Sequence, residues 1–230
     1  MITMGKKGNS RHMKSLNAPR FFSIHRKENK YVTKPRAGRH TLERAIPLAL
    51  LLEKTAAAKS MDEAKRMLSV RSVKVNGKVV KDSKYAVGLN DIVEITSEGK
   101  YYKIDINSQG HVTPVPMDKP ESTNLYKVLG KYKVKGGKLM LRLHDGSVVA
   151  GKADISVSDS VLIDNSRNIM SHLKMDAGAK CRVIEGAHVG THGAIKELVK
   201  GGMNRASSVI IEATDGSTFQ TPVRNIMVTK

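Results

Sequence analysis

The dipeptide Asn76-Gly77 constrains the fold of this chain more than any other feature of its sequence. Short runs that alternate apolar and polar residues flank it, residues 72–75 before and 78–80 after. Asn-Gly between such runs is the strongest local signal for a two-residue β-hairpin, because a type I′ turn needs positive φ at both central positions. The sequence therefore predicts a tight hairpin over residues 72–80.

Two helices are predicted before this hairpin. Ser60 and Glu63 have the spacing of a capping box, in which the hydroxyl accepts from the third helical amide and the carboxylate reaches back. The helix would cover residues 61–68. An earlier apolar face with a period near 3.6 predicts a helix over residues 41–59, and Pro47 limits where that helix can begin. Strands over 92–95 and 101–106 would complete a unit at 41–106.

Five bases lie on this helix–hairpin unit. Their position at a helix–hairpin junction suits the backbone of a rigid double-stranded nucleic acid better than a base-reading pocket. The alternative is a charged face that meets only solvent. The bases are Lys65, Arg66, Arg71, Lys74 and Lys78.

Residues 1–40 hold much of the chain's excess charge. The formal net charge is +19, and this segment carries eleven Lys and Arg against one acid, Glu28. Because its apolar residues follow no period, we expect an extended arm that neutralises phosphate and becomes ordered on binding. Phe21, Phe22 and Tyr31 lie among the bases, where aromatic rings can stack on unpaired nucleotides. The alternative is a solvated tail without a specific partner.

The middle of the chain, residues 107–175, predicts a mostly β domain without an assignable task. Short alternating runs indicate strands over 126–134, 138–143, 147–149 and 156–163, separated by glycine turns. Pro114, Pro116 and Pro120 predict a loop or linker. The triplet that begins at His144 is interpreted as a turn rather than as catalytic chemistry.

The last segment, residues 176–230, predicts five short strands, which favour a small β-barrel. A glycine-rich loop follows the first strand. Its glycines, Gly186, Gly190 and Gly193, allow sharp bends and a close approach to another backbone.

No catalytic or metal site is predicted. Cys181, His188 and His192 supply too few ligands for a structural zinc site, and a glycine-rich loop does not hold the histidines on one helix face. A Cys–His nucleophile pair is the alternative for Cys181, but its position within a strand favours a packed thiol. We therefore expect no cofactor and no small-molecule substrate.

The single cysteine excludes an intramolecular disulfide and favours a reducing compartment. Residues 1–30 lack the apolar core of a secretory signal. The longest apolar run, residues 45–52, is far shorter than the roughly 20 residues that span a bilayer. A cytoplasmic protein without a membrane partner is expected, and its net charge predicts a polyanionic partner, with nucleic acid as the first candidate.

The order of these segments resembles a known family. Residues 4–8, 16–19 and 33–40 look like the opening of the archaeal/eukaryotic (e) type of small-subunit ribosomal protein four. Residues 63–78 resemble the small RNA-binding domain that this family shares with bacterial ribosomal protein four and with RNA-modifying enzymes, and residues 85–91 resemble its continuation. Residues 183–198 look like a KOW motif, the strand–loop–strand of an SH3-like barrel.

Two positions depart from the family pattern. Arg71 stands where such domains usually carry a glycine before the hairpin, so a different turn is expected there. The resemblance begins at Met4, which predicts Met4 as the natural initiator and residues 1–3 as an extension.

The resemblance implies a multi-domain α+β protein. Its parts are a basic N-terminal arm at 1–40, a helix–hairpin RNA-binding domain at 41–106, a central β domain at 107–175 and a KOW SH3-like barrel at 176–230. It also implies a structural constituent of the small ribosomal subunit that binds ribosomal RNA, contacts neighbouring ribosomal proteins, is a monomer off the ribosome and is not an enzyme. The candidate RNA contacts are Lys6, Lys7, Arg11, Lys14, Arg36, Arg39, Lys65, Arg66, Arg71, Lys74, Lys78, Arg182, His188, His192 and Lys196.

Two other functions fit the sequence less well. An RNA-modifying enzyme, such as a pseudouridine synthase with an appended RNA-binding domain, needs a large α/β catalytic domain, and residues 101–230 are too short and too rich in predicted strands for one. A KOW adaptor of transcription elongation would leave the basic arm and the helix–hairpin unit unexplained.

Overall fold

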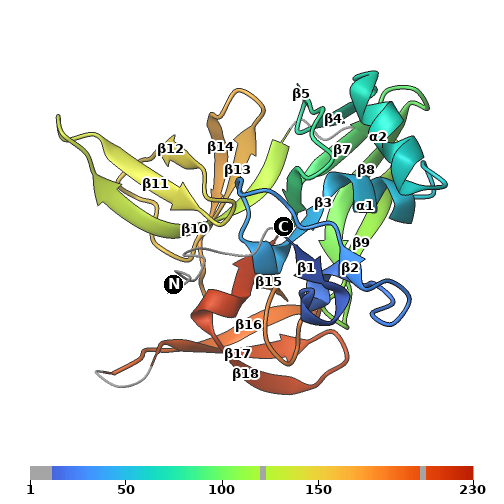
Figure 1. Ribbon diagram of the computed structural model, residues 1–230. Helices are drawn as coiled ribbons and strands as arrows, with labels where there is room; N and C mark the ends of the chain where they lie inside the picture. Colours follow the sequence, from blue (N-terminus) through green and yellow to red (C-terminus); the bar gives the residue numbers. More distant parts are fainter. Residues whose placement is uncertain (1–11, 120–122, 203–205, 230) are drawn as a thin grey trace, which may run out of the picture.

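The computed structural model describes residues 12–119, 123–202 and 206–229. The described chain is mostly β-sheet, with two α-helices, and its three five-stranded sheets form three lobes around a common centre (Figure 1). Within the described residues, neither helix is long and apolar enough to cross a membrane.

The N-terminal segment packs against the helices instead of extending as predicted. Strands β1 (Met13–Lys14) and β2 (Tyr31–Val32) pair, and the 3-10 turns η1 (Ser15–Asn17) and η2 (Arg20–Phe22) lie between them. Phe21 and Phe22 are buried, Phe22 completely. The prediction that these two rings stack on nucleotides is therefore wrong, because apolar packing takes both. Lys54 Nζ closes the contact by donating to the Ser23 carbonyl at 2.6 Å.

The first helix is shorter than predicted. The 3-10 turn η3 (Leu42–Arg44) leads into β3 (Ala45–Pro47), which pairs with β6 (Ala86–Gly88), and only then does α1 (Leu48–Lys54) begin. Pro47 has no amide hydrogen, so it fits at the boundary of a helix but not inside one. Its position therefore sets the start of α1 and leaves residues 45–47 for sheet pairing.

The second helix, α2 (Met61–Ser69), follows the capping signal. The Glu63 amide donates to Ser60 Oγ at 3.3 Å, as predicted. The reciprocal bond is shifted by one residue, because Glu63 Oε2 accepts from the Lys59 amide at 2.6 Å.

The predicted hairpin is confirmed. Strands β4 (Val73–Val75) and β5 (Lys78–Val79) pair across Asn76 and Gly77, whose φ angles are +49° and +75°. The sheet continues in the order β5-β4-β7-β8-β9, with β7 (Ile92–Ile95), β8 (Lys100–Ile106) and β9 (Val112–Met117).

Pro114 and Pro116 lie in β9 rather than in the predicted loop. A proline cannot donate to a neighbouring strand, but β9 is the edge of its sheet, where an outward-facing position needs no donor. The sheet thus continues past residue 106, the limit expected for this domain.

The central sheet has the order β12-β11-β10-β13-β14 and its own core, which includes Val128, Leu141 and Val161. Gly146, with φ +80°, closes the turn after His144, as predicted. The strands are β10 (Thr123–Lys133), β11 (Leu139–Leu143), β12 (Val148–Ala150), β13 (Ser160–Asp164) and β14 (Ile169–Leu173).

The C-terminal sheet has the order β18-β17-β16-β15-β19, and the 3-10 turn η4 (Val223–Asn225) joins its two edge strands. Among the described residues no pairing closes this sheet into a barrel, so the predicted closed barrel is not observed. Its core includes Val183, Ile195 and Ile211. The strands are β15 (Lys180–Val183), β16 (His192–Val199), β17 (Ser208–Ala213), β18 (Thr218–Pro222) and β19 (Ile226–Val228).

Candidate nucleic-acid interface

α2 and the hairpin expose basic side chains because their other sides are buried. Ala64 and Leu68 of α2 are fully buried, which turns Lys65 and Arg66 toward solvent. Lys65 Nζ lies 2.8 Å from an Asp62 carboxylate oxygen on the exposed side of the helix. Both elements lie at the same end of their lobe (Figure 1), and Ser72 Oγ links them by donating to the Met67 carbonyl at 2.8 Å.

Asp91 fixes the hairpin turn to the rest of the lobe. This buried carboxylate accepts from Asn76 Nδ2 at 2.7 Å and from the Gly88 amide at 2.9 Å. Its Oδ2 atom also lies 2.8 Å from Nε2 of the buried His40. Asn76 Oδ1 in turn accepts from the Ile92 amide at 2.9 Å. Buried polar contacts therefore hold the Asn76-Gly77 turn in place, and Lys78 follows directly after it.

Arg71 follows α2 in the left-handed conformation, with φ +62°. Its amide donates to the Leu68 carbonyl at 3.1 Å. A side chain at such φ is strained, whereas glycine adopts it freely. The chain thus takes a glycine-like path with an arginine, so the different turn expected at this position is not observed. The result is an exposed base between the helix and the hairpin.

Replacing Arg71 by glycine is expected to raise the free energy of unfolding by about 0.5 kcal/mol, since relief of the strained φ outweighs the added freedom of the unfolded chain. RNA affinity should fall at the same time. Arg71→Ala is the matched control, because it removes the same charge and keeps the strain. Urea unfolding of both variants checks this. Equal stabilisation by alanine would trace the gain to charge repulsion instead.

Besides Lys65, three more predicted contact residues of the first 106 residues are engaged by acids of the same chain. Lys74 Nζ lies 3.0 Å from Glu94 Oε1, and Arg36 Nη1 lies 2.9 Å from Asp82 Oδ2. Arg39 pairs with Asp145, whose side chain is completely buried. Arg39 thus ties the N-terminal segment to the central sheet.

Arg39 also borders a hollow of about 100 Å³ between the helix–hairpin lobe and the central lobe. Lys78 and Arg167 line the same hollow. Sequence reasoning missed Arg167, which has φ +64° in the turn between β13 and β14. No local pattern marks it, because its proximity to Lys78 arises only when the two sheets pack.

In the N-terminal segment, Lys14 is exposed on β1 opposite Tyr31. Tyr31 remains available for stacking, since it is 54% exposed and the His12 ring stands edge-on to it at 6.1 Å between centroids. Lys30 Nζ lies 5.7 Å from the centre of the Tyr31 ring. The other predicted contacts of this segment, Lys6, Lys7 and Arg11, lie outside the described residues, as does Met4.

The glycine-rich loop of the C-terminal lobe docks on the helix–hairpin lobe. Arg182 pairs with Asp105 and donates to the Ile106 carbonyl. Gly190 has φ +81°, and a Cβ there would lie 2.6 Å from the Asn107 carbonyl oxygen. The predicted close backbone approach is confirmed at Gly190. Arg182 is a second contact between the two lobes.

Of the predicted contacts of this lobe, Arg182 and His192 lie opposite each other on β15 and β16. The His188 ring stacks on Phe219, with 4.0 Å between centroids and 18° between planes. His192 and Lys196 are exposed on β16. Cys181 is buried in β15, and burial raises the pKa of its thiol to about 11, so it is a packed thiol.

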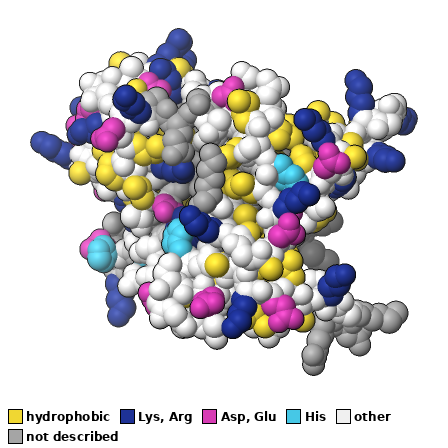
Figure 2. Space-filling view, turned by 180° about the vertical axis from the view of Figure 1, so that it is seen from behind, with side chains coloured by type: hydrophobic (Ala, Val, Ile, Leu, Met, Phe, Trp, Pro, Cys, Tyr) yellow, Lys and Arg dark blue, Asp and Glu magenta, His cyan; other side chains and the backbone are white. Residues whose placement is uncertain are grey.

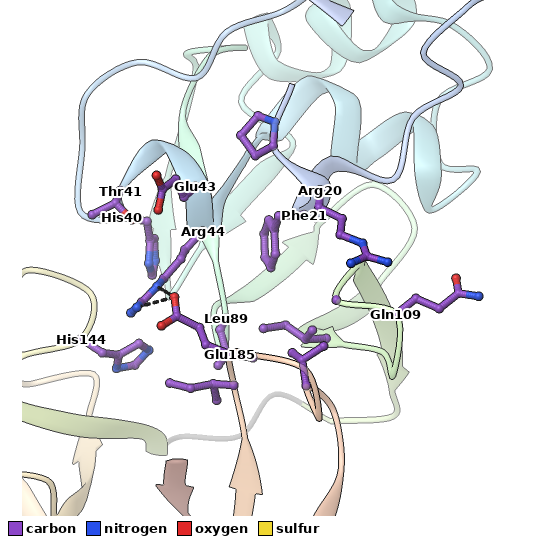
Figure 3. A pocket seen from close by; sticks show the side chains of 16 residues that line it. Arg20, Phe21, His40, Thr41, Glu43, Arg44, Leu89, Gln109, His144 and Glu185 are labelled. Carbon is purple, nitrogen blue, oxygen red and sulfur yellow. Dashed lines mark hydrogen bonds and ion pairs between the residues drawn. The ribbon is translucent and has the colours of Figure 1, made fainter. Parts of the chain in front are cut away.

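A cavity of about 320 Å³ lies where the lobes meet (Figure 3). Arg20 and Phe21 border it on one side, and His144 borders it on another. Arg44 and Glu185, which both line it, pair with each other. This ion pair therefore joins the two lobes at the cavity. In the part of the chain that the structure describes, no three His, Cys, Asp or Glu side chains are placed to hold a metal ion.

Profiles of three known families match consecutive parts of the chain. The RS4NT (NUC023) domain matches residues 7–43, the S4 domain matches residues 47–93, and the profile described as Ribosomal family S4e matches residues 98–169. The S4 match covers both helices and the hairpin, as the resemblance predicted.

Whole proteins match along nearly the full chain. Small ribosomal subunit protein eS4 of Methanocella arvoryzae is 33% identical over 219 residues, which cover 94% of this chain and 93% of the relative. The protein of the same name from Archaeoglobus fulgidus is 35% identical over 213 residues, covering 91% and 90%. The crystal structure of 30S ribosomal protein S4e from Thermoplasma acidophilum superimposes with a TM-score of 0.64 at 26% identity, covering 80% of this chain and 93% of that one.

Proposed function

Because the chain belongs to the ribosomal family S4e, we propose that it is a structural constituent of the small ribosomal subunit that holds ribosomal RNA in place. The observation that carries this proposal is the basic surface of the S4 domain, where α2 and a rigid hairpin expose Arg66, Arg71 and Lys78. Lysine and arginine on fixed backbone elements neutralise phosphates at set spacings, which positions a folded RNA without reading its bases.

The N-terminal segment and the C-terminal lobe would extend the contact. The strand order β19-β15-β16-β17-β18 and the 3-10 turn before β19 support an SH3-like arrangement, although the sheet stays open. The exposed His192 and Lys196 on β16 would face RNA there, and Lys14 would do so in the N-terminal segment.

The role is structural and needs no cofactor. A relative named small ribosomal subunit protein aligns over 94% of the chain, which supports a structural role over a catalytic one. Both an RNA-modifying enzyme and a transcription adaptor lose support from this coverage. The protein would act in the cytoplasm on the ribosome, beside neighbouring ribosomal proteins, and would be a monomer when released from it.

Sedimentation of cell extract through a sucrose gradient tests the proposal. We expect the protein to migrate with the small subunit and to remain there after a wash in moderate salt. Migration with free protein, or with RNA polymerase, would contradict it.

A charge-removing variant tests the surface itself. Arg66→Gln should reduce the slope of log K against log salt concentration by about 0.7–0.9 for a small-subunit rRNA transcript, because one phosphate contact is lost. Lys100→Gln serves as the control. Lys100 lies in the same lobe, where β8 begins, and its Nζ atom already pairs with Glu98 at 2.7 Å. Filter binding at several salt concentrations gives both slopes. Identical slopes for Arg66→Gln and the unchanged protein would remove Arg66 from the interface.

A further inference from the structure

The hairpin formed by β10 and β11 projects from the central lobe into solvent. β10 is long and divides its pairing: residues 123–127 pair with β13, while residues 130–133 pair with β11. The end of the hairpin is therefore two-stranded, and it forms the yellow-green projection at the left of Figure 1. Dark blue side chains gather on the corresponding projection at the right of Figure 2.

This hairpin is uniformly basic. Residues 125–144 contain six Lys and Arg and no Asp or Glu. Two of the six are used within the protein: Lys127 Nζ donates to three carbonyls of residues 223–226, and Lys131 Nζ donates to the carbonyls of Ala153 and Ile155 at 2.5 and 2.8 Å. The remaining four are exposed. They are Lys133, Lys135, Lys138 and Arg142.

The register gives the two faces of the hairpin different chemistry. Lys131 opposes the buried Leu141, so that face turns toward the core. Tyr132 opposes Met140 on the other face and is 44% exposed. An aromatic ring thus lies open on a sheet face that no other described element covers by strand pairing or core packing.

Arg142 lies on the same face as this ring, because the pair Gly130–Arg142 stands two residues along the register from Tyr132–Met140. Gly130 opposes Arg142, and a Cβ on Gly130 would lie 3.8 Å from Arg142 Nε. The arginine can therefore lie along the strand surface. Lys138 lies on the same face nearer the turn. It stands opposite Val134, whose amide donates to the Lys138 carbonyl at 3.0 Å. Val134, 40% exposed, adds an apolar neighbour.

We propose that this face of the β10–β11 hairpin binds unpaired nucleotides of RNA, with a base stacked on Tyr132 and phosphates held by Lys138 and Arg142. The proposal rests on the proposed ribosomal function and gives the central lobe a part in it. The absence of acids from residues 125–144 selects a polyanion. The exposed ring selects unpaired bases over a duplex, because a base must leave its pair before an aromatic side chain can stack on its face.

The chain contains no tryptophan, which allows a local reporter. In the full chain, Tyr132→Trp should place a single indole on the proposed face, and a 12-nucleotide oligouridylate should quench its fluorescence. Met170→Trp is the matched control, because Met170 is 66% exposed on β14 of the same lobe and should not be quenched. A paired RNA duplex should quench Tyr132→Trp far less than the single strand does.

The affinity of the site is tested with the same probe. Lys138→Gln and Arg142→Gln, each introduced into the Tyr132→Trp protein, should weaken the quenching titration roughly three- to tenfold, since each removes one phosphate contact. Tyr132→Ala in the otherwise unchanged protein should reduce crosslinking of the oligonucleotide to the hairpin by roughly tenfold, which corresponds to the loss of one stacked base.

Two outcomes would overturn the inference. One is an unquenched Tyr132→Trp protein that still binds a small-subunit rRNA transcript, which leaves the proposed function intact. The other is quenching by polyglutamate that equals quenching by RNA, which would assign the face to an acidic protein. If the protein without substitutions did not bind the rRNA transcript at all, that result would instead contradict the proposed function.

Discussion

Replacing Asp91 by alanine is expected to lower the free energy of unfolding by about 3–5 kcal/mol. The carboxylate is 3% exposed and holds three groups at once, namely the His40 ring, the Asn76 side chain and the Gly88 amide. Alanine would leave all three without an acceptor in the interior. Urea unfolding at neutral pH measures the loss. A change below about 1 kcal/mol would mean that water replaces the carboxylate.

The same site predicts an acid limb of the stability profile. Burial alone would raise the pKa of Asp91, but attraction to His40 and its hydrogen bond, together with the Gly88 amide, outweigh burial and hold this pKa below 3.8. A lowered folded-state pKa stabilises the protein above the unfolded-state pKa, and this contribution is lost as pH falls through the folded value.

Asp91→Asn is the variant that isolates this contribution, because it keeps the shape and cannot titrate. The free energy of unfolding of the unchanged protein should fall below about pH 4, while the difference between it and Asp91→Asn should shrink over the same range. Urea midpoints at pH 7, 5, 4 and 3 give the comparison. A constant difference would show that Asp91 does not titrate with folding.

Lys127 gives the second large effect. Its side chain is 1% exposed, and its ammonium donates to the carbonyls of Val223 at 2.8 Å, Arg224 at 2.9 Å and Ile226. Burial, with repulsion from Arg44, lowers its pKa to about 8, so the ammonium form still predominates at pH 7. This one side chain thus binds the central lobe to the turn before β19.

Lys127→Met keeps the volume and removes the donors, and we expect it to lower the free energy of unfolding by about 3 kcal/mol. Hydrogen exchange should also accelerate in residues 223–228. Lys131→Met is the matched control on the same strand, since its ammonium donates to two carbonyls from a less buried position, and it should cost about 1 kcal/mol. Equal losses for both variants would contradict an interdomain role of Lys127.

The elements that the sequence predicted correctly depend on contacts between near neighbours in the chain. The type I′ turn at Asn76-Gly77 and the cap at Ser60 require only their own backbone, so local patterns were sufficient. The predicted strand–loop–strand of residues 183–198 forms β15, a loop and β16 for the same reason.

The wrong predictions concern residues whose environment comes from distant parts of the chain. Phe21 and Phe22 lie in a basic segment, yet α1 offers them an apolar surface that composition does not reveal. Pro114 and Pro116 are tolerated in β9 because that strand is an edge. The basic residues divide in the same way, since local spacing predicts the five bases of the helix–hairpin unit but not the position of Arg167 beside the same hollow as Lys78.

The sequence by itself determined the charge, the turn types, the helix caps and the family, because these depend on residue identity and short spacing. Only the tertiary structure decided which bases remain available. It engages Arg39 with Asp145 and Arg182 with Asp105, and it leaves the β10–β11 hairpin exposed. The physical reason is that an ion pair or a buried contact requires two groups within a few ångströms, and for residues from different lobes that separation is fixed only when the sheets pack.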